Sequence, residues 1–258
     1  MQPFYAPDGP GRYLPSPTTA GPWSPHSQHG GPPAALLVRA VESLPEARDA
    51  LVGRFTLDLL GPVPLGPLLV RTSVVRPGRS VRLVEAVLVE ESRGRPCARA
   101  NVWLFPDTGP DADSCPSPTP EPGPDGEPRA LPADWHTGYL DAVEWRWLSG
   151  AVSEPGPGTV WMRPRVELVA GEPMSPVQRL MACVDSASGV SAALDPSGWT
   201  FVNTELSVHL LRRPVGEWLL LEAETALGPG RLGTATALVH DRAGPVARTA
   251  QALLVTRR

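Results

Sequence analysis

The stretch SPVQRLMACVDSASG at residues 175–189 decides the fold class, together with the segments that follow it. Small and apolar residues dominate this stretch, which predicts a helix. Four runs rich in β-branched and aliphatic residues come next, separated by turn formers such as Gly228-Pro229-Gly230. An apolar helix buries well when antiparallel strands wrap around it, so this half predicts an α+β unit. The four runs are Val202–Leu210, Glu217–Ala226, Gly233–His240 and Pro245–Thr256.

The same order of elements occurs earlier in the chain. The segment PPAALLVRAVE at residues 32–42 predicts a helix with proline in its first turn, where helices tolerate it. Residues 96–100, PCARA, also match residues 245–249, PVART. We therefore expect a duplicated unit whose two sheets join edge to edge. The strand-like runs of the first copy are Phe55–Leu59, Leu68–Val75, Ser80–Glu90 and Pro96–Phe105, and the second copy opens with strands at Gly138–Leu148 and Thr159–Leu168.

A linker is predicted between the two copies. Residues 106–132 are rich in proline, glycine and acidic side chains and offer almost nothing to bury. The chain then divides into an N-terminal domain at residues 1–105, this linker, and a C-terminal domain at residues 133–258.

Composition excludes several classes of function. The formal charge of −4 gives no basic field that would gather nucleic acid. Three scattered cysteines form no Cys-x-x-Cys, so neither a disulfide framework nor a zinc site is indicated. The sequence has neither a signal-like start nor an apolar run of about 18 residues, so we expect a cytoplasmic protein with no membrane span.

Three polar residues stand in apolar surroundings. Asp185 lies inside the predicted helix 175–189, where partial desolvation would prepare its carboxylate to act as a base. Thr204 shares the strand parity of Leu206 and Val208, so its hydroxyl is expected to point toward that helix. Asn203 is one residue away, and a shift of register would exchange the two.

Gln251 is the third of these polar residues. It lies on the last strand with the parity opposite to Arg248, which is expected to face outward. A buried amide needs partners, and a neighbouring carboxylate and water would satisfy it. Its counterpart in the first copy is Val102, an ordinary core residue, so the two copies differ here in polarity.

Several motifs resemble one family. The segment QHGGPPAALL at residues 28–37 resembles the N-terminal half of actinobacterial acyl-CoA thioesterases of the double-hotdog thioesterase II type. Residues 139–146 (YLDAVEWR), 175–179 (SPVQR) and 248–254 (RTAQALL) are similar to the C-terminal half of that family. The resemblance implies a tandem double hotdog that hydrolyses acyl-CoA without cofactor or metal. It also implies that the catalytic aspartate is Asp185, the acid available in this helix, and that Thr204 takes the place of the family's catalytic threonine.

The two copies have complementary gaps. Single-hotdog thioesterases carry a His-Gly-Gly turn at the helix start and an acid about two turns later on the same helix. Here His29-Gly30-Gly31 supplies the turn, but eight residues onward stand Val38 and Arg39. The second copy keeps the acid and lacks the glycines. We therefore expect one shared site per chain, in which Gly30 or Gly31 N–H groups bind the carbonyl oxygen while Asp185, Thr204 and Gln251 activate a water that attacks directly.

Other interpretations stay open at this stage. A mid-helix aspartate is often a solvated residue, and His29 is expected to close its turn structurally beside the substrate. A non-catalytic acyl-CoA or acyl-carrier binding protein is an alternative, whereas a hotdog hydratase would need a histidine that the helix 175–189 lacks. Exposed sheet edges would allow a homo-oligomer. Arg39, Arg179 and Arg212 are candidates for contacts with the CoA phosphates.

Overall fold

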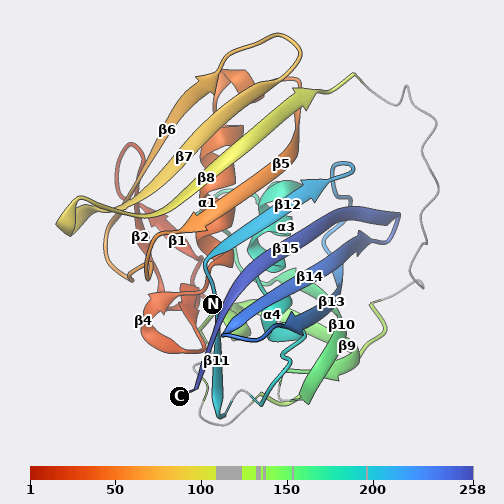
Figure 1. Ribbon diagram of the computed structural model, residues 1–258. Coiled ribbons are helices and arrows are strands. Elements are labelled where there is room, and N and C mark those ends of the chain that lie inside the picture. The colour runs from red at the N-terminus through yellow and green to blue at the C-terminus, as the bar shows by residue number, and fades with distance from the viewer. Residues whose placement is uncertain (109–123, 132–134, 136–137, 153, 196, 258) are drawn as a thin grey trace.

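One large antiparallel sheet wraps around a pair of helices (Figure 1). The computed structural model describes the chain except for residues 109–123, 132–134, 136–137, 153, 196 and 258. In the described residues this sheet has 13 strands. The strands of its first half, with the preceding helix, are β1 (Tyr5–Pro7), β2 (Arg12–Pro15), α1 (Gly31–Glu42), β5 (Ala50–Leu59), β6 (Leu68–Arg76), β7 (Arg82–Glu90) and β8 (Arg95–Pro106).

The second half repeats this arrangement in the other part of the sheet. The strand order β6-β7-β8-β5 is followed directly by its mirror, β12-β15-β14-β13. The central strands β5 and β12 are antiparallel, with Thr56 opposite Ser207. The predicted duplication and the joining of two sheets at their edges are therefore confirmed. The elements of this half are α2 (Gly138–Ala142), β9 (Val143–Ala151), β10 (Glu154–Pro164), α3 (Pro176–Val184), α4 (Ala187–Val190), β11 (Trp199–Asn203), β12 (Glu205–Leu210), β13 (Leu219–Leu227), β14 (Leu232–Asp241) and β15 (Gly244–Arg257).

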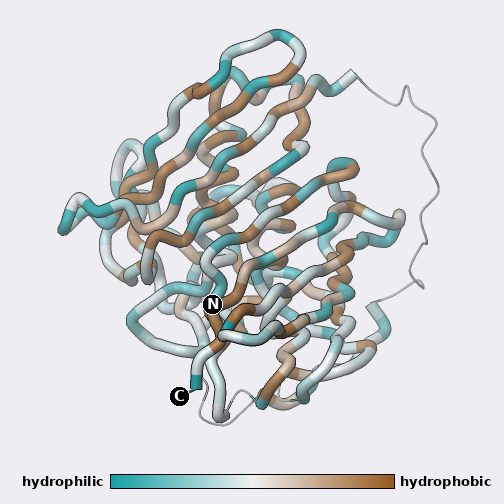
Figure 2. The backbone as a smooth tube through the Cα atoms, in the orientation of Figure 1, coloured by the Kyte–Doolittle hydropathy of each residue, from teal (hydrophilic) through white to brown (hydrophobic). Residues whose placement is uncertain are grey.

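Helices α1 and α3 pack against each other on one face of the sheet. In α1, the run from Gly31 to Val38 is completely buried. At the start of α3, the Ser175 hydroxyl accepts from the Gln178 N–H and the Gln178 side chain accepts from the Ser175 N–H, which forms a capping box. Both helices are therefore core elements, and apolar and polar residues alternate along the strands around them (Figure 2).

The predicted helix 175–189 is interrupted at Asp185. The Tyr139 hydroxyl donates to the Ala182 carbonyl at 2.7 Å. That carbonyl would accept from the Ser186 N–H in a continuing α-helix, but the Ser186 N–H donates to the Cys183 carbonyl instead. The prediction of one continuous helix is therefore wrong, and Asp185 caps the C-terminus of α3.

Two further expectations need correction. The strand expected at Gly138–Leu148 starts as the short helix α2 and becomes strand β9 only at Val143. The end of the predicted linker is also attached to the sheet, because the backbone of Glu127 exchanges two hydrogen bonds with Trp147. Residues 109–123 and 132 of that linker lie outside the described residues, and the domain limits stay a prediction.

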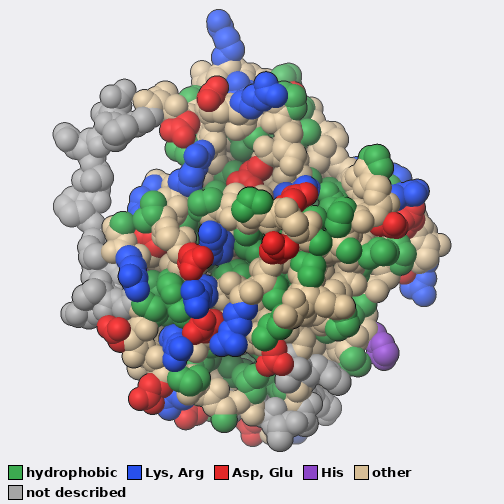
Figure 3. Space-filling view, turned by 180° about the vertical axis from the view of Figure 1, so that it is seen from behind, with side chains coloured by type: hydrophobic (Ala, Val, Ile, Leu, Met, Phe, Trp, Pro, Cys, Tyr) green, Lys and Arg blue, Asp and Glu red, His purple; other side chains and the backbone are tan. Residues whose placement is uncertain are grey.

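The cysteines and the surface add little chemistry. Cys97 and Cys183 are free and buried, while Cys115 lies outside the described residues. Seen from the helix side, arginine and acidic side chains are interspersed (Figure 3). In the described part of the chain, each helix is too short or too polar to cross a lipid bilayer.

Candidate active site

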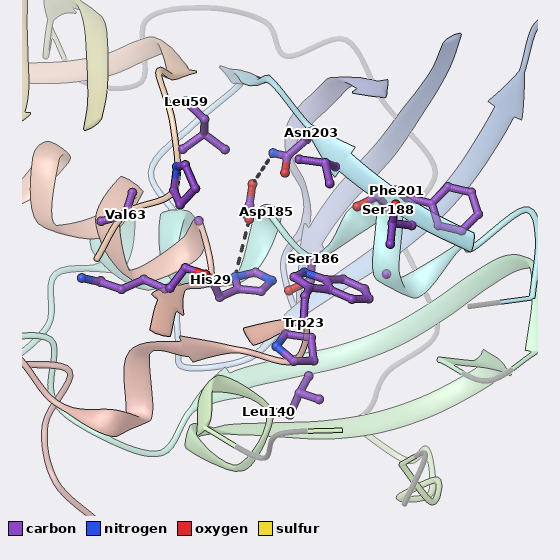
Figure 4. Close-up of a pocket in the computed structure, with 18 of the residues that line it drawn as sticks. Trp23, His29, Leu59, Val63, Leu140, Asp185, Ser186, Ser188, Phe201 and Asn203 are labelled. Carbon is purple, nitrogen blue, oxygen red and sulfur yellow. Dashed lines mark hydrogen bonds and ion pairs between the residues drawn. The ribbon is translucent and has the colours of Figure 1, made fainter. Parts of the chain in front are cut away.

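Asp185 lies at the C-terminus of α3 with its side chain almost fully buried. Its Oδ1 atom accepts hydrogen bonds from Asn203 Nδ2 at 2.8 Å and from Gln251 Nε2 at 3.1 Å. Figure 4 shows this carboxylate pointing toward Asn203, with His29 close to it. The carboxyl group is thus held by neutral amides, without an arginine partner.

Gln251 on β15 faces the interior, as its strand parity predicts, and is fully buried. Its Nε2 also donates to the Asp185 backbone carbonyl at 3.0 Å, and its Oε1 accepts from the Ser188 N–H at 3.1 Å. All of these bonds fix the turn between α3 and α4, from which Asp185 projects. Its counterpart Val102 is also fully buried, but among apolar side chains.

Thr204 does not point toward Asp185. A bend at this residue separates β11 from β12, so the strict alternation assumed for one continuous strand is lost. The exposed Thr204 lines the cavity, and its hydroxyl donates to the Ala252 carbonyl at 3.5 Å. Asn203 instead makes the contact with the carboxylate, so the exchange between these neighbouring residues has occurred.

The His29-Gly30-Gly31 turn lies directly against Asp185. His29 Nδ1 is 3.5 Å from Asp185 Oδ2, and a Cβ atom added at Gly30 would lie 2.5 Å from the same oxygen. Any larger residue at position 30 would therefore displace the carboxylate. The first half thus contributes the turn and the second half the acid.

Burial controls the ionisation of both groups. Desolvation raises the pKa of Asp185 to about 7, although hydrogen bonds from Asn203, Gln251 and the Gly30 backbone hold it lower than burial alone would. Burial lowers the pKa of His29 to about 3, so the imidazole is neutral. The contact between these two residues is therefore not an ion pair.

The tautomer of His29 follows from its contacts. The Gly31 N–H donates to His29 Nδ1 at 3.1 Å, so the proton of this neutral ring resides on Nε2. The ring stacks on Tyr139 with 3.8 Å between centroids and 4° between planes. Within the described residues, Nε2 has no hydrogen-bond partner, and His29 lines the cavity.

The amide N–H groups of the glycine turn are less available than expected. Gly31 N–H is bound to His29, and the next two residues, Pro32 and Pro33, have no N–H. The Gly30 N–H lowers the pKa of Asp185 by hydrogen bonding to it. The Gly30 and Gly31 amides, which were expected to bind the carbonyl oxygen, therefore both have partners within the protein, and that role stays a prediction.

A cavity of about 370 Å³ contains this cluster. Its wall includes Trp23, Leu59, Val63, Leu140, Trp145 and Phe201 beside Asp185, which gives an apolar volume with one carboxyl group. Sequence reasoning missed Tyr139 and Ser186, whose hydroxyls are 2.9 Å apart beneath His29. Tyr139 at the start of YLDAVEWR was a visible signal, but nothing local indicated which helix it would contact.

The proposed CoA-side arginines lie elsewhere. Arg39 forms a bidentate pair with Glu172, and Arg212 forms one with the buried Asp241. Arg179 donates to the Met174 carbonyl at 3.4 Å. None of the three lines the cavity around Asp185, so their selection for the phosphates is not supported by position. Across the described residues, no group of three or more His, Cys, Asp or Glu side chains is arranged to hold a metal ion.

Structural relatives share this architecture over the full chain. A protein of unknown function with a hot dog fold from Alicyclobacillus acidocaldarius has a TM-score of 0.75 at 18% identity, covering 95% of this chain and 92% of its own. The acyl-CoA thioesterase II TesB2 of Mycobacterium marinum has a TM-score of 0.68 at 16% identity, covering 96% and 92%. A search of curated proteins found no match. At these identities the structural likeness shows the double-hotdog fold.

Family models address the sequence itself. Residues 19–105 match the acyl-CoA thioesterase N-terminal domain, and residues 112–255 match the acyl-CoA thioesterase C-terminal domain. Together these matches span most of the 258 residues. The resemblance found in the sequence motifs is thus confirmed, and the chain belongs to the acyl-CoA thioesterase family of thioester hydrolases.

Proposed function

We propose that the chain hydrolyses acyl-CoA by direct attack of a water molecule that Asp185 activates. The observation that carries this proposal is a buried carboxyl group with a pKa of about 7 at the wall of an apolar cavity. A base is most effective when its pKa is near the working pH, because it is then both available and able to accept a proton. The apolar wall suits the acyl chain, while the polar CoA would remain outside.

His29 and Asn203 complete the proposed chemistry. The Nε2–H of neutral His29 would donate to the thioester carbonyl oxygen, replacing the Gly31 amide in that role. Asn203 and Gln251 hold the Asp185 carboxylate in place while it takes a proton from the attacking water. Thr204, which lines the cavity, is proposed to orient the water or the substrate at the entrance.

The proposed reaction balances without a covalent enzyme intermediate. Asp185 takes one proton from water as the oxygen attacks the carbonyl carbon. The tetrahedral intermediate then expels the thiolate by breaking the carbon–sulfur bond, and Asp185 returns the proton to the sulfur. The products are a free acid and CoA.

Thiol release from acyl-CoA, compared between the wild type and Asp185→Asn, tests this function. We expect the variant to lose about 10³-fold in kcat, within the range found for general bases. Burial raises the folded-state pKa of Asp185, so its contribution to stability is full below the unfolded pKa and is lost as pH rises through about 7. Asp185→Asn should therefore melt at a higher temperature than the wild type at pH about 8, which separates lost chemistry from lost folding.

A single turnover in ¹⁸O-water distinguishes direct attack from an acyl-aspartate. Direct attack places the label in the product acid and leaves Asp185 unlabelled. If the carboxylate itself attacked, an acyl-aspartyl anhydride would form and could be trapped. Hydrolysis of this anhydride at the aspartyl carbon would leave the label in Asp185, whereas hydrolysis at the acyl carbon would leave it in the product acid. Acyl-CoA binding without thiol release by the wild type would indicate the alternative binding function.

A further inference from the structure

Two cavities lie on opposite sides of one small wall. Leu140, Trp145 and Val152 line the cavity that contains Asp185, and the same three residues line a neighbouring cavity of about 160 Å³. Exposed residues of the first cavity, among them Trp23, Val202 and Thr204, mark its entrance, whereas Leu140 and Val152 are about 95% buried. Leu140 and Val152 are therefore at the inner end of the cavity, with Trp145 bonded to Leu140 beside them.

The wall is held in place by its own contacts. The Trp145 indole N–H donates to the Leu140 carbonyl at 2.9 Å, and the Trp145 ring meets the Tyr139 ring edge to face at 6.2 Å. Trp145 also stacks on Trp147, with 6.3 Å between ring centroids. These contacts hold Trp145 against Leu140, Tyr139 and Trp147.

The end of the predicted linker lines the neighbouring cavity. Pro128, Arg129 and Leu131 form part of its wall. Glu127 fixes this segment to β9 through the two backbone hydrogen bonds with Trp147, and a Cβ atom at Gly126 would lie 2.6 Å from the Arg146 carbonyl carbon. The segment thus lies too close to the sheet at position 126 for any residue with a side chain. Apolar residues Leu131, Val143 and Trp147 form much of the lining.

We propose that Leu140, Trp145 and Val152 form the floor that limits acyl-chain length, and that the neighbouring cavity would accept a longer chain if this floor were opened. The inference rests on the proposed function, because it assumes that the acyl group fills the first cavity. A cavity of about 150 Å³ can hold benzene. The neighbouring cavity, at about 160 Å³, has room for a similar number of carbon atoms.

Val152→Ala, with Val63→Ala as its matched control, tests the floor. Both valines are buried and line the first cavity, but only Val152 also lines the second. The substrates are acyl-CoAs from butyryl to stearoyl. We expect Val152→Ala to move the optimum of kcat/KM toward longer chains by about two carbons. The double variant Leu140→Ala/Val152→Ala should move the optimum by up to about six carbons, the content of a benzene-sized cavity. Val63→Ala should leave the optimum in place. Val152→Phe should fill the inner end and move the optimum toward shorter chains.

The outcomes separate this inference from the proposed function. Identical chain-length profiles for Val152→Ala, Val152→Phe and the wild type would overturn the floor while leaving hydrolysis intact. If the wild type released no thiol at all, the proposed function would fail. Calorimetric affinities for non-hydrolysable thioether analogues of the same chain lengths would then still decide whether Val152 sets the length limit.

Discussion

The two ends of the α1–α3 helix pair carry cavities of similar size but opposite chemistry. At one end, the start of α1 and the end of α3 enclose Asp185. At the other end, the end of α1 and the start of α3 enclose a second cavity of about 420 Å³ with Glu42 in its wall. Because the strand order of the sheet is a mirror repeat about β5 and β12, these two places correspond to each other. The comparison isolates the residues that distinguish a reactive end from an unreactive one.

Amide side chains on the strands contact the acid at only one of the two ends. Asn203 lies four residues before Ser207, and Val52 lies four residues before Thr56, the partner of Ser207 at the centre of the sheet. Val52 lines the second cavity, where no amide occupies that position. Gln251 and Val102 differ in the same way. The duplicated backbone thus provides two equivalent frames. Amides from the strands hold the carboxylate in one of them, whereas residues at the start of α3 hold it in the other.

The acids at the two ends also meet different helix starts. Glu42 accepts from the Ser175 hydroxyl at 2.8 Å and from Gln178 Nε2 at 2.7 Å. Ser175, the N-cap of α3, has a side chain that bonds to Glu42. The N-cap of α1 is Gly30, and the Asp185 carboxylate occupies the space where a side chain would lie. Glu42 is only partly buried, whereas Asp185 is almost fully buried. The two acids thus differ in burial, and burial is what raises the pKa of Asp185.

Substitution by alanine at the two helix starts should give the largest difference in activity between the two ends. Gly30→Ala places a Cβ atom 2.5 Å from Asp185 Oδ2, so the carboxylate must move. We expect kcat/KM to fall about 10²-fold, because displacements of about 1 Å in a reacting group have effects of that size. Ser175→Ala at the other end should change kcat/KM less than about twofold and cost about 1 kcal/mol of stability through the lost N-cap. Steady-state kinetics and chemical denaturation measure the two effects, and equal activity losses in both variants would contradict the assignment of roles.

This asymmetry is visible in the amino-acid sequence itself. Because the chain is a duplication, its two copies can be compared position by position. The comparison reveals the glycine pair, the single acid in 175–189 and the difference between Gln251 and Val102. The direction of the Thr204 side chain could not be predicted from the sequence. Parity arguments assume a straight strand, and the bend between β11 and β12 depends on how two segments of β15 pair with them.

Long-range contacts account for the other differences. The break in the helix 175–189 depends on Tyr139, which is 43 positions before the carbonyl that it binds. The floor of the cavity combines residues from α2, β9 and the β9–β10 connection, with the linker end behind it. No local sequence pattern predicts these long-range contacts, because each residue involved is consistent with ordinary packing in its own segment.

Gln251→Val would make the reactive end resemble its counterpart at Val102. A hydrogen bond to a charged group contributes about 1.5–3 kcal/mol, so we expect kcat to fall at least about tenfold. The wild-type rate should fall about tenfold per pH unit below pH about 7, because the carboxylate is the active form. The Gln251 hydrogen bond lowers the pKa of Asp185, so its removal should move this midpoint to higher pH. A pH–rate profile with an unchanged midpoint would show that Gln251 does not act through the carboxylate, and Val102→Ala serves as the control that leaves the midpoint in place.

Glu42→Gln should have the smallest effect on catalysis. It therefore tests whether the second cavity is independent of the first. The amide keeps one oxygen to accept from Ser175 and Gln178, so the junction between α1 and α3 stays bonded while its charge is lost. We expect kcat/KM and its pH midpoint to stay within about twofold and a few tenths of a pH unit, because charges separated by a helix length are screened at ordinary salt. The measurement is the same pH–rate profile in parallel with the wild type. A larger change would mean that the second cavity is coupled to the first through the α1–α3 pair, and the two ends would then have to be treated as one system.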